Sequence, residues 1–309
     1  MKNKFNAMAT VVTAPVADVF FSFQGEGVYL GQPMVFIRFA GCNLICDYCD
    51  TPERDMKVKH REMDARQLAA KTLKLWNKNI SHIKKSLKPK YSRAVNKRID
   101  FVPTVSLTGG EPLMYASFLM HLLPLLKKLN LRIYLETNGT LSAGLKKVIR
   151  WVDIVSMDIK MPSSCNGKTY WTQHANFLMT CLKNSHVDVF VKVVIAGSTL
   201  LEELNRALEI TSGYGGHIPF ILQPATPAAN FSERTSPGEL VHLMKRGVKE
   251  KRGGIKNISV GKTAEKTSAQ MYAPLRMSEK LFAFYKYSKK FLNKVYILPQ
   301  LHKLVWNVK

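Results

Sequence analysis

The chain has 309 residues, a formal net charge of +24 and a hydrophobic content of 46%. That content is enough to form a core in one large domain, which excludes a disordered chain. Because no apolar run is long enough to cross a bilayer and the first residues lack a signal-peptide pattern, we expect a cytoplasmic protein with no membrane partner.

Short β-rich runs alternate with helical patterns along the chain. The first is PMVFIRFA at 33–40, which has the composition of a buried strand, and further strands are expected at 104–108, 132–137, 153–159, 187–195 and 219–224. Apolar residues with helical spacing lie between these runs, at 116–130, 142–150, 171–186 and 200–212. The alternation predicts βα units and a parallel sheet in an α/β fold, with polar motifs at the strand ends. About six such strands are too few to close an eight-stranded barrel.

Two segments interrupt this regular order within what we expect to be a single domain, 1–309. Residues 52–100 read as a basic helical insertion, with helical spacing at 64–80. A second insertion or C-terminal extension is expected at 229–290, with helices near 237–250 and 276–293.

The excess positive charge is concentrated in two regions. Residues 57–98 hold 14 Lys or Arg against two acidic residues, and residues 245–309 hold 16 against three. Such segments can bind RNA, DNA or another anionic partner by neutralising phosphates. Since no stacking or base-reading motif accompanies the lysines, a solvated basic surface is favoured over nucleic-acid binding.

Three cysteines in the pattern CxxxCxxC, Cys42, Cys46 and Cys49, follow the strand at 33–40. Thiolates hold iron–sulfur clusters, and a set of three leaves one iron of a [4Fe-4S] cluster open to another ligand. A structural zinc site would need a fourth ligand nearby, and a disulfide would leave one thiol over, so both alternatives are weaker. The other two cysteines, Cys165 and Cys181, are expected to be buried or free thiols.

The second motif is LTGGEPL at 107–113, at the end of an expected strand. Gly109 and Gly110 let the backbone approach a ligand closely, and Glu111 can accept a hydrogen bond from an ammonium group. Together with the cysteines, this motif resembles the radical S-adenosylmethionine (SAM) superfamily. The resemblance implies a partial, open TIM-like barrel, with SAM bound to the open iron of a [4Fe-4S] cluster. It also implies that reductive cleavage of SAM gives a 5′-deoxyadenosyl radical.

A longer motif narrows the resemblance. Residues 21–51, FSFQGEGVYLGQPMVFIRFAGCNLICDYCDT, resemble the 7-carboxy-7-deazaguanine synthase family, as do LETNGTL at 135–141, VSMDIKMPSS at 155–164 and LPQLHKL at 298–304. The family implies ring contraction of 6-carboxy-5,6,7,8-tetrahydropterin to 7-carboxy-7-deazaguanine with loss of ammonia, in queuosine-type biosynthesis. It further implies Mg²⁺ beside the cluster and SAM, a small-molecule pterin substrate, a reductant such as flavodoxin or ferredoxin, and a homodimer.

The same resemblance implies roles for individual residues. The cluster ligands are Cys42, Cys46 and Cys49, and the Mg²⁺ ligand is Thr51. The SAM-binding residues are Tyr48, Gly110, Glu111, Asn138, Ser156, Lys160 and Gln223. The substrate-binding residues are Gln24, Glu26, Arg38, Thr108, His302 and Lys303, and a bidentate clamp by Arg38 suits the substrate carboxylate.

Two other functions stay open on the sequence. A glycyl-radical-activating enzyme would share the cysteine motif, but it gives no reason for QGEG at 24–27 or for the terminal LPQLHK. A nucleic-acid-associated protein with a degenerate core would use the basic segments, and the intact cysteines and GGEP argue against degeneracy.

Overall fold

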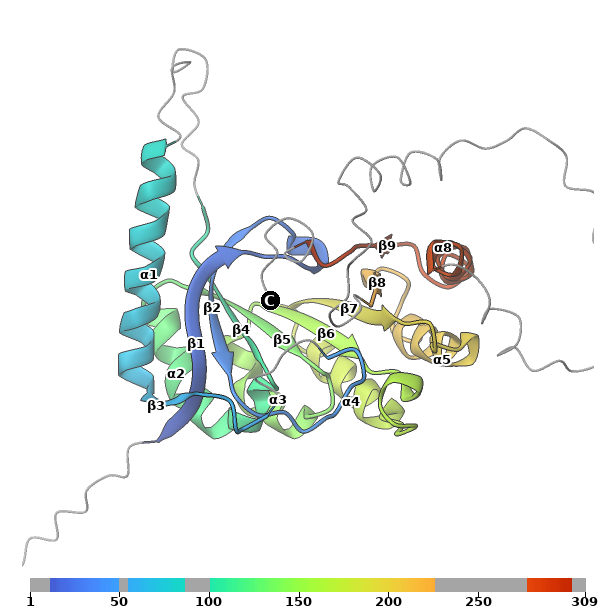
Figure 1. Cartoon of the computed structure of the whole chain (residues 1–309), viewed down its shortest axis with the longest axis horizontal. Coiled ribbons are helices and arrows are strands. Elements are labelled where there is room, and N and C mark those ends of the chain that lie inside the picture. Colours follow the sequence, from blue (N-terminus) through green and yellow to red (C-terminus); the bar gives the residue numbers. More distant parts are fainter. Residues whose placement is uncertain (1–11, 50–54, 87–100, 226–276, 302–309) are drawn as a thin grey trace, which may run out of the picture.

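The protein is described by a computed structural model over residues 12–49, 55–86, 101–225 and 277–301 (Figure 1). Its strands are β1 (Thr13–Phe23), β2 (Pro33–Phe39), β3 (Arg61–Asp64), β4 (Thr104–Gly109), β5 (Arg132–Thr137), β6 (Ile154–Ile159), β7 (Asp188–Ile195), β8 (Phe220–Pro224) and β9 (Val295–Ile297). Its α-helices are α1 (Ala65–Ser86), α2 (Ala116–Lys128), α3 (Ser142–Val148), α4 (Trp171–Leu182), α5 (Leu201–Ser212) and α8 (Met277–Ser288).

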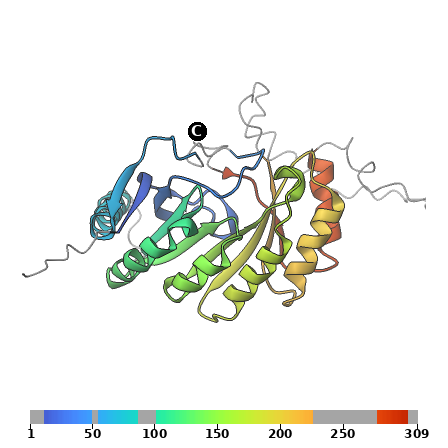
Figure 2. The same cartoon turned by 90° about the horizontal axis from the view of Figure 1, so that it is seen from below.

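All nine strands form one sheet in the order β3-β1-β2-β4-β5-β6-β7-β8-β9. From β2 through β4 to β9 each strand runs parallel to its neighbour, whereas β1 pairs antiparallel with both β2 and β3. Helices line the convex side of the curved sheet (Figure 2). Among the described residues no pairing joins β3 to β9, so the barrel is open. The predicted α/β fold with a partial, open TIM-like barrel is confirmed.

The two faces of the sheet have different compositions because successive residues of a strand point to opposite sides. On β7, Val191 and Val193 belong to the main hydrophobic core beneath the helices. The concave face begins with an apolar layer of Met34, Phe36, Tyr134, Ile154, Phe190 and Ile221. Two residues further along these strands the side chains become polar, at Arg38, Glu136, Ser156, Lys192 and Gln223. This change places a polar layer near the carboxyl ends of the strands.

The sequence did not predict β1, β3 and β9. β1 contains Pro15 and has no strict alternation, β3 is a charged four-residue segment, and β9 has three residues. These strands are stabilised by pairing with distant parts of the chain, which a local pattern does not record. The helix expected at 237–250 lies outside the described residues.

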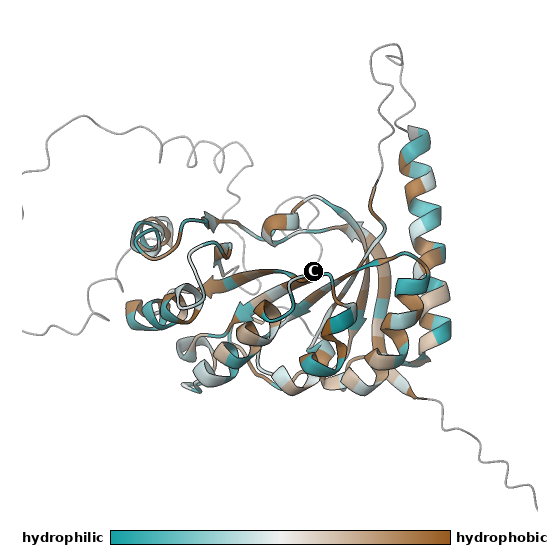
Figure 3. Cartoon of the chain, turned by 180° about the vertical axis from the view of Figure 1, so that it is seen from behind, coloured by the Kyte–Doolittle hydropathy of each residue, from teal (hydrophilic) through white to brown (hydrophobic). Residues whose placement is uncertain are grey.

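The basic segment 52–100 contributes β3 and α1 to the described fold. α1 takes the position of the crossover helix between the parallel strands β2 and β4, and it buries Leu68 and Trp76 in the main core. Its opposite face is hydrophilic (Figure 3), and Lys71 and Lys78 are exposed there. Helix formation is therefore driven by one apolar stripe. Within the part that the structure describes, no helix has the length and apolarity needed to span a membrane.

Candidate active site

A cavity of about 170 Å³ lies at the carboxyl ends of the parallel strands. Parallel strands present these ends at one edge of the sheet, so residues distant in sequence meet there. The lining residues include Glu26, Cys42, Cys46, Tyr48, Cys49, Thr108, Gly109, Gly110, Glu136, Thr137, Asn138, Ser156, Asp158, Lys160, Lys192, Gln223 and Gln300.

The two sequence motifs meet through backbone contacts at this edge. The amide of Gly110 donates to the carbonyl of Phe39 at 3.0 Å, and that of Glu111 donates to the carbonyl of Gly41 at 2.8 Å. A Cβ atom on Gly110 would lie 1.8 Å from the Gly41 carbonyl oxygen, so the contact requires glycine. Gly110 thus fixes the GGEP loop against the start of the cysteine loop.

The three thiols fit an iron–sulfur cluster better than a zinc ion. Cys42, Cys46 and Cys49 line the same cavity, yet no three His, Cys, Asp or Glu side chains of the described residues lie close enough to hold one metal ion. Structural zinc needs four ligands around one ion, whereas each thiolate of a [4Fe-4S] cluster binds its own iron. The Sγ of Cys42 also accepts from the Leu44 amide at 3.5 Å and from Asn138 Nδ2 at 3.8 Å, as expected of a thiolate ligand.

Glu111 is fully buried behind the cavity and connects two loops. Its Oε1 accepts from the Leu113 amide at 3.0 Å and from Thr137 Oγ1 at 2.9 Å, and its Oε2 accepts from the Asn138 amide at 2.8 Å. Burial raises the pKa of Glu111 to about 7, although these hydrogen bonds oppose the shift. The side chain therefore positions Asn138 in addition to its predicted role toward SAM.

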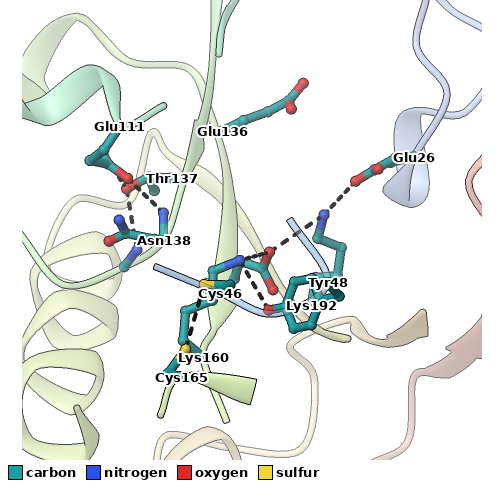
Figure 4. A network of polar contacts seen from close by, with 12 residues as sticks. Glu26, Cys46, Tyr48, Glu111, Glu136, Thr137, Asn138, Lys160, Cys165 and Lys192 are labelled. Carbon is teal, nitrogen blue, oxygen red and sulfur yellow. Dashed lines mark hydrogen bonds and ion pairs between the residues drawn. The ribbon is translucent and has the colours of Figure 1, made fainter. Parts of the chain in front are cut away.

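A chain of ion pairs crosses the cavity (Figure 4). Lys160 Nζ lies 2.7 Å from Asp158 Oδ2 and 3.2 Å from Tyr48 Oη. Lys192 pairs with Glu26, and its Nζ lies 3.7 Å from the same Asp158 oxygen. Burial alone would lower the pKa of both lysines, but the neighbouring carboxylates raise it, so both stay cationic. The chain links the cysteine loop to the N-terminal QGEG segment.

Glu136 organises the other wall of the cavity. Its Oε1 accepts from Gln24 Nε2 at 2.9 Å and from Ser106 Oγ at 2.9 Å, and its Oε2 accepts from Thr108 Oγ1 at 3.0 Å. Two predicted substrate-binding residues, Gln24 and Thr108, thus share one carboxylate.

Two buried acceptors in the cavity have no hydrogen-bond donor within the described structure. They are Asp158 Oδ1 and Gln223 Oε1. A buried polar atom without a partner costs roughly 1–3 kcal/mol, so such atoms suit a ligand that brings its own donors. The amino group and ribose hydroxyls of SAM are donors of this kind.

The structure brings most of the predicted site residues together. Around the cavity lie Glu26, the three cluster cysteines, Tyr48, Thr108, Gly110, Asn138, Ser156, Lys160 and Gln223. Gln24 and Glu111 are buried and are not among the lining residues. Arg38 is not among the lining residues, and its guanidinium carbon lies 5.3 Å from the centre of the Phe20 ring. Thr51, His302 and Lys303 fall outside the described residues.

Four lining residues with charged or amide side chains were not predicted from the sequence: Glu136, Asp158, Lys192 and Gln300. For two of them a local signal exists, because Glu136 follows buried Tyr134 by two positions and Lys192 follows buried Phe190 in the same way. A single charge on the inward side of an apolar strand needs a partner, so it indicates a polar site. Gln300 has no such signal.

The His174 side chain on α4 forms hydrogen bonds with the backbone of two loops at the site. Its Nε2 accepts from the Lys160 amide at 3.1 Å, so Nδ1 carries the proton and donates to the Gly139 carbonyl at 3.1 Å. Burial lowers the pKa of His174 from the usual 6.5 to about 4. The histidine is therefore neutral in the folded protein at neutral pH.

We expect His174→Gln to reduce the sensitivity of the fold to acid. Below pH 6.5 the unfolded chain binds a proton at this site and the native protein does not, so stability is lost as the pH falls from 6.5 to about 4. This loss amounts to about 3 kcal/mol for one histidine. Urea unfolding from pH 7 to pH 4 measures it, with His121→Gln, on the exposed side of α2, as the control. Equal acid sensitivity in all three proteins would contradict the assignment.

Comparisons with known proteins agree with this geometry. A family model described as "4Fe-4S single cluster domain" matches residues 23–176. The 7-carboxy-7-deazaguanine synthase of Geobacter sulfurreducens is 37% identical over 232 residues, covering 70% of this chain and 84% of that protein. The synthase of Methanothermobacter thermautotrophicus is 29% identical over 245 residues, covering 73% and 87%.

Among solved structures, QueE from Escherichia coli is similar over 76% of this chain and 91% of that one, with 17% identity and a TM-score of 0.44. That similarity is too low to carry an argument. The sequence identity to the Geobacter protein extends over most of both chains. On this basis the chain belongs to the 7-carboxy-7-deazaguanine synthase family.

Proposed function

We propose that this radical SAM enzyme converts 6-carboxy-5,6,7,8-tetrahydropterin to 7-carboxy-7-deazaguanine with loss of ammonia, as a step of 7-deazaguanine biosynthesis. The reaction would take place in the cavity described above. The observation that carries the proposal is the set of side chains that line the cavity. The chain's membership of the family supports the same reaction. The three cysteines of CxxxCxxC line the same cavity as polar side chains from β4 to β8. Such a cavity suits a polar bicyclic substrate beside a metal cluster.

Different residues around the cavity would bind the cluster and SAM. Cys42, Cys46 and Cys49 would hold the [4Fe-4S] cluster, and SAM would lie against Tyr48, Gly110, Asn138, Ser156, Lys160 and Gln223. When bound, the cluster and SAM supply the radical that removes a hydrogen atom from the substrate. The unpartnered acceptors Asp158 Oδ1 and Gln223 Oε1 support a ligand rich in N–H and O–H donors on this side.

The opposite wall fits the edge of a pterin, which offers both donors and acceptors. Glu26 and Glu136 accept hydrogen bonds, and Gln24 and Thr108 are held beside Glu136 at 2.9 and 3.0 Å. These side chains are fixed by protein hydrogen bonds before substrate arrives, which lowers the cost of ordering them on binding. We assign the substrate-recognition role to this wall.

Further components of the proposal rest on the sequence. Mg²⁺ would bind at Thr51, and His302 and Lys303 would contact the substrate. The substrate carboxylate would be clamped by Arg38. A flavodoxin or ferredoxin would supply the electron, and the enzyme would act as a homodimer. Among the described residues no disulfide joins any of the five cysteines, which suits a reducing cytoplasm.

An anaerobic assay tests the reaction. The protein is reconstituted with iron and sulfide, then given reductant, SAM, Mg²⁺ and 6-carboxytetrahydropterin, and 7-carboxy-7-deazaguanine is measured by mass spectrometry. We expect product that depends on every component, with omission of Mg²⁺ testing the metal separately. SAM cleavage to 5′-deoxyadenosine without this product would overturn the substrate assignment and keep the radical chemistry.

We expect Arg38→Ala to separate SAM cleavage from product formation. Loss of a bidentate pair to the carboxylate should lower product roughly tenfold or more, while 5′-deoxyadenosine still forms. The ratio of the two compounds is the measurement. Arg132→Ala is the matched control, since Arg132 also stacks over a ring, Tyr29 at 5.4 Å, but starts β5 at the amino edge. An Arg38→Ala enzyme that forms product and 5′-deoxyadenosine in the wild-type ratio would contradict the proposed carboxylate clamp.

A further inference from the structure

Cys165 lies directly against a cluster ligand although it is not part of the CxxxCxxC motif. Its Sγ is 3.5 Å from the Sγ of Cys46, and the two residues are 3% and 7% exposed (Figure 4). Neither the sequence motifs nor the proposed reaction gives Cys165 a role.

The position of Cys165 is fixed by its own turn and by the cysteine loop. Its amide donates to the Pro162 carbonyl at 2.9 Å at the end of a short 3₁₀ helix (Pro162–Ser164). The Asp47 amide donates to the Ser164 carbonyl at 3.0 Å, which joins this turn to the cysteine loop. Glu203 on α5 accepts from the amide and the hydroxyl of Ser163, both at 2.6 Å. The sulfur–sulfur contact is therefore held by three independent anchors.

The chemistry decides which sulfur carries the proton. A cysteine that binds a metal centre does so as a thiolate, which accepts hydrogen bonds and has no proton to donate. Cys165 is then the donor and Cys46 the acceptor. The contact is buried and packs against Leu44, Tyr48 and Tyr170, and a hydrogen bond shielded from water in this way is stronger than one in water.

We propose that Cys165 donates an S–H···S hydrogen bond to the Cys46 thiolate and thereby raises the reduction potential of the cluster. Reduction adds negative charge that is shared with the ligand sulfurs, so a donor to one of them stabilises the reduced form more than the oxidised form. Hydrogen bonds to sulfur are among the factors that set cluster potentials. Cys165 is a positioning residue, and the inference rests on the cluster assignment made under the proposed function.

The test is a redox titration of the reconstituted cluster, followed by electron paramagnetic resonance in the absence of substrate. Cys165→Ala removes the donor, and Cys165→Ser keeps one. A lost hydrogen bond should lower the ratio of reduced to oxidised cluster roughly fivefold at a fixed potential, a shift of about 40 mV for one electron. Cys165→Ser should stay close to the wild type. Cys181→Ala is the matched control, because Cys181 is a buried thiol in the main core.

Each outcome separates this inference from the proposed function. A lower potential in Cys165→Ala, with Cys165→Ser and Cys181→Ala unchanged, supports the hydrogen bond. An unchanged Cys165→Ala potential, or equal shifts in the alanine and serine variants, overturns it. Loss of iron and sulfide from Cys165→Ala would show a ligand or structural role and would also overturn it. A wild-type protein that takes up no cluster would instead refute the cluster assignment itself.

Discussion

Cys46→Ala is expected to abolish both the iron–sulfur cluster and all turnover. Removing one of three thiolates leaves two protein ligands for a cluster that normally needs at least three. Cys46 is also 7% exposed, and its Sγ lies 3.5 Å from the Sγ of Cys165. After anaerobic reconstitution we expect iron and sulfide contents near zero, no 5′-deoxyadenosine and no 7-carboxy-7-deazaguanine.

Cys181→Ala controls for the loss of a buried thiol. Cys181 lies on α4 in the main hydrophobic core, away from the cavity lining. This variant should take up a normal amount of iron and sulfide and should keep its activity. Ring contraction retained by Cys46→Ala would refute the assignment of Cys46 as a ligand.

Lys192→Met should destabilise the fold by about 3–5 kcal/mol, because it leaves the Glu26 and Asp158 carboxylates buried without the Lys192 ammonium. The Lys192 and Glu26 side chains are 11% and 15% exposed, so water solvates the remaining Glu26 carboxylate poorly after the cation is lost. Urea unfolding of the cluster-free protein at pH 7 measures the loss.

Two further variants test whether loss of the Lys192–Glu26 ion pair causes the loss of stability. Adding Glu26→Gln to Lys192→Met removes the uncompensated charge, so the double variant should recover part of the lost stability. Lys127→Met breaks the Lys127–Asp153 bridge, whose side chains are 38% and 27% exposed, and should cost about 1 kcal/mol or less. Equal losses in Lys192→Met and Lys127→Met would mean that the central ion pair contributes no more than a surface bridge.

Local patterns in the sequence predicted the parallel part of the sheet. The runs at β2, β4, β5, β6, β7 and β8 are short β-rich segments flanked by helical periodicity, and each forms a strand within one or two residues of its expected bounds. The pattern is strong because both faces of these strands are buried. β1, β3 and β9 carry weaker patterns, since their stability comes from pairing with partners that the local sequence does not identify.

The cysteine spacing and the GGEP run likewise predicted a cluster loop next to a ligand-binding turn. Both motifs are local in sequence, and the steric need for glycine at Gly110 is a local property of the backbone. The same motif predicted a contact between Glu111 and SAM, and the fold shows that the Glu111 carboxylate accepts hydrogen bonds from the Asn138 and Leu113 amides. The contact with Asn138 depends on two loops meeting, which no single motif encodes.

The sequence by itself determined the chemistry class, the family resemblance and the strand ends where polar residues gather, because these depend on residue type and short spacing. Only the tertiary structure decided the pairings: Lys192 with Glu26, Glu136 with Gln24, and Cys165 with Cys46. The members of each pair are separated by 166, 112 and 119 residues. Contacts across such separations exist because the curved parallel sheet brings the carboxyl ends of its strands and the segments beside them to one edge.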